Sequence, residues 1–109
     1  MGKKNEIKEQ ASMTEIVFSR DARPPGIVFR MGGKDGLARF SPYGWLSSCD
    51  HEIAGRTLKL DFSRYDVVLR AAEHHSLDRL FAAVTKNECS EVAEKAGALT
   101  IEIVEKEER

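Results

Sequence analysis

The hydrophobic period of the chain changes from two to about 3.6 residues between positions 56 and 81. Leu58, Leu60 and Phe62 alternate with polar residues, and the alternation resumes after a break at residues 63–64. Apolar residues then follow helical spacing at Leu77, Leu80, Phe81 and Val84. This switch predicts a β-hairpin that leads into an amphipathic helix.

The ends of that helix are predicted from residues with known positional preferences. Ser76 is a suitable N-cap, and Asp78 would then lie in the first turn, where the helix dipole favours a negative charge. We expect the helix to run to about Lys86, and Asn87 is a suitable stop.

Alternating or β-rich segments also predict strands over residues 14–19, 26–31, 37–41 and 99–103. Pro24-Pro25-Gly26 predicts a loop, and the three glycines of residues 32–36 predict a tight turn rather than a phosphate-binding loop, since a strand follows them. Residues 45–53 fit a strand or an irregular segment. Residues 89–96 fit a strand or a short helix.

Short turns force neighbouring strands to be antiparallel. The predicted class is therefore α+β, with an antiparallel, curved sheet or partly open barrel of five to six strands and one amphipathic helix before the last strand. We expect a flexible polar tail over residues 1–12, a single domain over 13–105 and a charged tail over 106–109.

Composition indicates an ordinary globular domain. The 109 residues are 41% hydrophobic and 32% charged, and the net charge of −1 gives no electrostatic reason to expect nucleic acid or an anionic membrane as a partner. The sequence contains neither the roughly 20 consecutive apolar residues of a membrane span nor the apolar region of a secretory signal. With only two cysteines, we expect reduced thiols and a cytoplasmic protein.

Cys49-Asp50-His51 is the segment with the most chemical potential. With Cys89, His74 and His75 it offers sulfur and imidazole for a zinc site or a cysteine nucleophile. The spacing lacks the close ligand pairs typical of zinc sites, so we favour Cys49 as a small buried side chain. Cys49, His51, His74 and His75 are kept as a low-priority ligand or metal site, and no catalytic residue or cofactor is assigned.

Aromatic and basic residues suggest two surfaces. Tyr43 and Trp45 either plug an open end of the barrel, which we favour, or form an interface. Basic residues of the sheet with neighbouring aromatics offer a weak site for RNA or single-stranded nucleic acid. These residues are Arg20, Arg23, Arg30, Lys34, Arg39, Phe40, Tyr43 and Trp45.

The predicted helix of about three turns is too short to cover a sheet of five or six strands. We therefore expect a small non-catalytic interaction module that binds a protein partner or a second copy of itself. The alternative is a small-ligand-binding or enzymatic domain that uses a pocket between helix and sheet near Cys49, Asp50 and His51.

Overall fold

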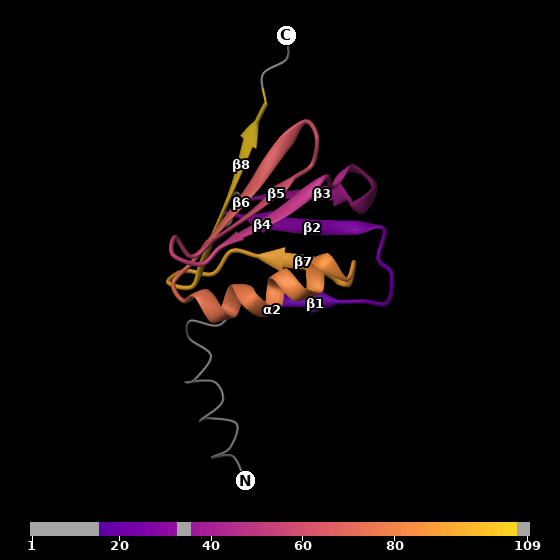
Figure 1. Cartoon of the computed structure of the whole chain (residues 1–109). Helices are drawn as coiled ribbons and strands as arrows, with labels where there is room; N and C mark the ends of the chain where they lie inside the picture. Colours follow the sequence, from indigo (N-terminus) through magenta and orange to yellow (C-terminus); the bar gives the residue numbers. More distant parts are fainter. Residues whose placement is uncertain (1–15, 33–35, 107–109) are drawn as a thin grey trace.

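A computed structural model describes residues 16–32 and 36–106 of the chain (Figure 1). The predicted tail over residues 1–12 lies outside these ranges, as do residues 107–109 of the predicted charged tail over 106–109 and Thr14 and Glu15 of the first predicted strand. The elements are β1 (Phe18–Arg20), β2 (Gly26–Met31), β3 (Leu37–Pro42), the 3₁₀ helix η1 (Tyr43–Trp45), β4 (Ser48–Glu52), β5 (Thr57–Asp61), β6 (Tyr65–Ala71), α2 (His74–Thr85), β7 (Cys89–Ala93) and β8 (Leu99–Glu105).

The strands form two four-stranded sheets. Sheet A has the order β1-β7-β2-β3, and sheet B has the order β4-β5-β6-β8. Neighbours are antiparallel except for β2 and β7, whose parallel pairing is possible because the long connection through β3, β4, β5, β6 and α2 separates them in the chain. The α+β class with mostly antiparallel pairing is confirmed.

The number of strands and the position of the helix were predicted wrongly. Eight strands in two sheets replace the expected single sheet of five to six strands, and α2 precedes the last two strands rather than the last one. The sequence left residues 89–96 open between a strand and a short helix, because β7 lies between two neighbours and runs parallel to one of them, so its burial does not alternate cleanly.

The hairpin of β5 and β6 is confirmed. Its register places Leu58 opposite Leu69 and Leu60 opposite Val67, and all four side chains are buried. The uncertain segment 45–53 forms the end of η1 and then β4, while 89–93 forms β7.

The helix begins earlier than predicted. Its N-cap is Glu73, whose side chain makes no capping hydrogen bond, and no acidic residue lies in the first turn, so the roles predicted for Ser76 and Asp78 were wrong. The amide of Ala72 donates to the carbonyl of Ala98, in the turn just before β8, and the helix begins two residues after Ala72. The C-terminal end is close to the prediction: Lys86 is the C-cap, and Asn87 has a φ of 57°.

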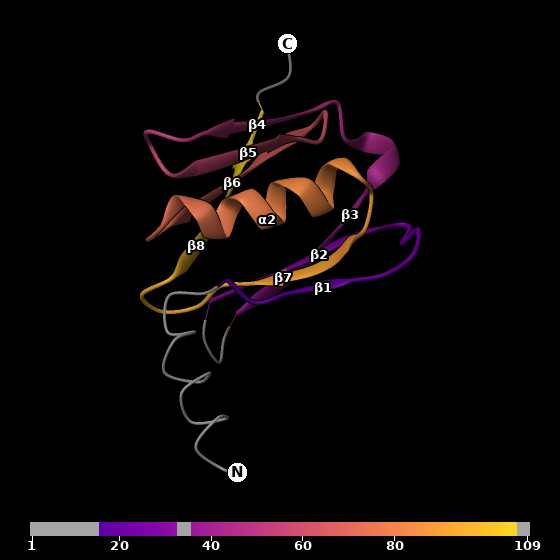
Figure 2. The ribbon, with the colours of Figure 1, turned by 60° about the horizontal axis from the view of Figure 1, so that its bottom comes forward.

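The two sheets and α2 enclose one hydrophobic core. Figure 2 shows α2 lying between sheet B and the strands β7 and β1. The largest fully buried side chains come from both sheets and the helix, and each aliphatic or phenylalanine side chain among them contributes about 1.5–3 kcal/mol by leaving water. They are Phe29, Phe62, Ile27, Leu58, Leu60, Leu69, Leu77, Leu80, Val67, Val84, Val92 and Cys89.

The second sheet therefore covers the area that the helix leaves open. Within residues 16–32 and 36–106, no helix is long and apolar enough to cross a membrane.

Candidate functional site

Cys49 and His51 share the inner face of β4, as expected for an extended segment, while Asp50 and Glu52 face solvent. Only 8% of the His51 side chain is exposed, and its ring lies 5.6 Å from that of Phe81 on α2, measured between centroids. The Nδ1 atom of His51 is 3.4 Å from a carboxylate oxygen of Asp78, whereas Nε2 is buried without a hydrogen-bond partner.

The two cysteines are free thiols; Cys89 is buried and Cys49 is part-buried. Burial raises the pKa of Cys49 to about 12, and the nearby Asp50 carboxylate adds to the effect. Burial also raises the pKa of Cys89 to about 12. Both thiols are therefore protonated at neutral pH, which favours packing over a thiolate nucleophile or metal ligand.

The structure does not bring the low-priority metal ligands together among the residues that it describes. No group of three or more His, Cys, Asp or Glu side chains there is arranged to hold a metal ion. The side chains of His74 and His75 lie outside the described set, so their approach to Cys49 or His51 stays a prediction.

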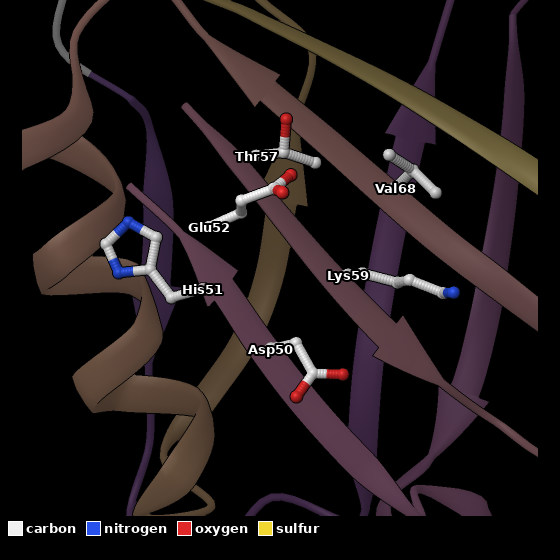
Figure 3. A pocket seen from close by; sticks show the side chains of 6 residues that line it. All are labelled: Asp50, His51, Glu52, Thr57, Lys59 and Val68. Carbon is white, nitrogen blue, oxygen red and sulfur yellow. The ribbon is translucent and has the colours of Figure 1, made fainter. Parts of the chain in front are cut away.

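A depression of about 470 Å³ lies on the outer face of sheet B, beside the predicted segment. Figure 3 shows Asp50, Glu52 and Lys59 on this face, while the ring of His51 is directed toward α2. Buried aliphatic side chains such as Leu58 and Leu77 fill the core between helix and sheet, where the sequence had suggested a pocket. The depression has a charged, solvated wall with Asp50 paired opposite Lys59.

The basic residues of sheet A do not form one face. Arg30 and Arg39 lie on opposite faces of sheet A, and each contacts other side chains of the same chain. Arg30 pairs with Glu91 on the outer face, whereas Arg39 lies 4.7 Å over the ring of Tyr65 and 3.3 Å from Glu105. Lys34 is outside the described residues.

Tyr43 and Trp45 have different environments. Tyr43 packs against the core, and its hydroxyl donates a 2.7 Å hydrogen bond to the Cys89 carbonyl. The side chain of Trp45 is 49% exposed, so it does not plug the interior as we had favoured. Of the two predicted interface residues, Trp45 is exposed and Tyr43 is part-buried.

The edges of the sheets carry a different candidate surface. The amide of Tyr43 donates to the carbonyl of Pro25, which fixes the hydrogen-bonding pattern between β2 and β3. Since bonded pairs alternate in an antiparallel ladder, Leu37, Arg39 and Ser41 bond to β2, and the amides of Ala38 and Phe40 point outward. This outward row, with the exposed side chains of Leu37, Ala38 and Phe40, is called the β3 edge.

The side chains of the β3 edge leave it open to solvent. Leu37 is 56% exposed and Phe40 is 50% exposed, and Ala38 between them is also exposed. The one charged residue of the strand, Arg39, is turned away from the outer face toward Tyr65 and Glu105. The ring of Phe40 lies over Gly26, where an added Cβ would come within 2.7 Å of it, so Phe40 is held on the outer face of sheet A.

The other edges are protected in ways common in natural sheets. The edge of β8 is occupied at one end, since Leu99 bonds to the backbone of Lys95 and the Glu94 carboxylate accepts the amide of Ile101 at 2.8 Å. The strand β4 presents Asp50 and Glu52 on its outer face. The strand β1 has only three residues.

Sequence reasoning did not identify the β3 edge. The segment 37–41 was recognised as a strand, but pairing order cannot be read from one sequence, so its position at the end of a sheet was not apparent. A useful signal was present: Leu37 and Phe40 fall on opposite faces of the strand, so no choice of face buries both.

Comparisons with known proteins provide no assignment. No protein-family model matches the chain, and searches of curated proteins and of solved structures find no significant similarity.

Proposed function

We propose that this protein is a small non-catalytic interaction module that binds a protein partner by strand addition at the β3 edge. In strand addition, an extended segment of the partner pairs with a free edge, so that backbone hydrogen bonds supply affinity and neighbouring side chains supply specificity. The observation that carries the proposal is the contrast between the open edge of β3 and the protected edges of β1, β4 and β8.

Two features support the choice of β3. The outward amides and carbonyls of Ala38 and Phe40 offer the hydrogen-bonding groups that a partner strand needs. The exposed side chains of Leu37 and Phe40 flank these groups on opposite faces of the strand and add apolar area on each side. Apart from the inward-turned Arg39 and the terminal Pro42, the strand carries none of the charged side chains or prolines with which natural proteins blunt an edge.

Site-specific photo-crosslinking in an extract of the source cells tests this function. A photoreactive benzoyl group on the ring at position 40 is expected to form covalent adducts with another polypeptide. Ile53, in the connection between β4 and β5, is the matched control because its side chain is 59% exposed and lies outside the β3 edge. Adducts at position 40 but not at 53 support the proposal, and their absence at position 40 contradicts it.

A further inference from the structure

We infer that the partner at the β3 edge is a second copy of this chain, paired through antiparallel β3 strands on a two-fold axis at Ala38. This inference rests on the proposed function and names its partner. It joins two copies of sheet A into one continuous eight-stranded sheet, since each sheet A has four strands.

The register follows from the outward amides. Only pairings that place outward residues opposite outward residues form hydrogen bonds, and Ala38 and Phe40 both find partners within residues 36–42 only when the axis passes through Ala38, Arg39 or Phe40. An axis at Arg39 sets two guanidinium groups directly opposite each other, and like charges in that position destabilise the pair. An axis at Phe40 sets Ala38 opposite Pro42, which has no amide hydrogen to donate.

An axis at Ala38 avoids both conflicts. Ala38 then lies opposite Ala38 of the second copy, and Phe40 lies opposite Gly36 of the second copy, with backbone donors and acceptors available in each pair. On the other face, Leu37 lies opposite Arg39 of the second copy. The apolar stem of Arg39 can cover the exposed Leu37 side chain there, while its guanidinium remains with Glu105.

Charge pairing also disfavours a second copy at another edge. Self-pairing of β4 through its outward residues Cys49 and His51 would set Asp50 opposite Asp50 of the second copy when the axis lies at Asp50, and opposite Glu52 of the second copy when the axis lies at His51. The β3 strand has no acidic residue, and its only basic residue avoids its own counterpart in the Ala38 register. The interface is a single strand pair, so we expect a dimer that dissociates on dilution.

A charge-swap experiment at position 38 tests the inference. Sedimentation of the wild-type protein should show a mass that rises with concentration toward twice 12.2 kDa. Because position 38 faces itself across the axis, Ala38→Lys and Ala38→Glu should each weaken the dimer about fivefold or more, and mixing the two variants should restore it. Ser48→Lys and Ser48→Glu, at an exposed position of the β4 strand, are matched controls that should leave the dimer unchanged.

Ala38→Pro provides a second test. The amide of Ala38 makes no bond to β2, so proline removes an outward donor without breaking the ladder of sheet A, and it should abolish the dimer. Circular dichroism of each variant checks that the fold is retained.

A wild-type monomer at the highest concentration tested overturns the inference, and so does a dimer that is insensitive to position 38. Loss of the dimer without restoration in the mixture overturns the Ala38 register. The crosslinks at position 40 separate failure of this inference from failure of the proposed function. Adducts with other proteins would support the interaction module even if the protein is a monomer. A monomer without adducts at position 40 would refute both self-pairing and the proposed function.

Discussion

A buried hydrogen bond between Ser41 and Tyr65 joins the two sheets and allows a quantitative prediction. The Ser41 Oγ atom on β3 and the Tyr65 hydroxyl on β6 are 2.7 Å apart, and the residues are 0% and 6% exposed. Ser41→Ala leaves the tyrosine hydroxyl buried without this partner, and Tyr65→Phe does the same to the serine. A buried polar group that loses its partner costs about 1–3 kcal/mol, so each single variant should lose about that much stability.

The double variant should lose little more than either single variant. Removing both hydroxyls leaves no unpaired group, while the phenyl ring at position 65 keeps its packing against Phe62 and under Arg39. The coupling free energy between the two positions should therefore be about 1–2 kcal/mol. Urea unfolding of the wild type, both single variants and the double variant measures it.

Tyr43→Phe is the matched control. It also removes one hydroxyl with a 2.7 Å hydrogen bond, but its acceptor is the Cys89 carbonyl rather than Ser41. Its effect should add to that of Ser41→Ala. Strict additivity of Ser41→Ala and Tyr65→Phe would refute the idea that this hydrogen bond joins the sheets.

Three further predictions follow from individual side chains. Stability should fall as pH rises from about 8.5, the ordinary pKa of a thiol, toward the raised pKa of about 12 at Cys49 and Cys89, because over this range the folded state binds more protons than the unfolded state. Unfolding measured against pH should show a shallower decline for Cys89→Ala, and an unchanged slope would contradict the raised pKa of Cys89. His51→Phe should raise stability by about 1 kcal/mol in thermal unfolding, because it keeps the ring beside Phe81 and removes the buried, unpartnered Nε2 atom. A loss of stability would contradict the claim that the unpartnered Nε2 atom destabilises the fold. The hydrogen bond from Lys106 holds the pKa of Asp61 below its ordinary value, so Lys106→Met should raise the pKa of Asp61 in an NMR titration. An unchanged pKa would show that Lys106 and Asp61 do not pair in solution.

The local elements could be predicted from the sequence where one face is buried and the other is solvated. The hairpin of β5 and β6 shows this pattern, since Leu58, Leu60, Val67 and Leu69 alternate with more exposed residues. The strand β2 was predicted with its exact bounds because Ile27 and Phe29 show the same alternation. The alternation reports burial directly, and burial decides the local structure.

Tertiary pairing could not be predicted in the same way. The residues of β7 pair with β1 and β2, which lie far away in the chain, and no local pattern encodes such partners. The start of α2 was misplaced for a related reason, because the bond from Ala72 to Ala98 sets where the chain leaves the sheet. The candidate site depends on the same information: Leu37 and Phe40 form an edge because, among residues 16–32 and 36–106, β3 pairs with β2 alone and is the last strand in the spatial order of sheet A.

Amide hydrogen exchange at two protein concentrations tests the central claim most directly. The account predicts that the amides of Ala38 and Phe40 exchange rapidly in dilute protein and become protected in concentrated protein. The outward amides of Cys49 and His51 on β4 should exchange at the same rate in both. Exchange at Ala38 and Phe40 that does not change with concentration, or protection that develops instead at Cys49 and His51, would contradict self-pairing through β3.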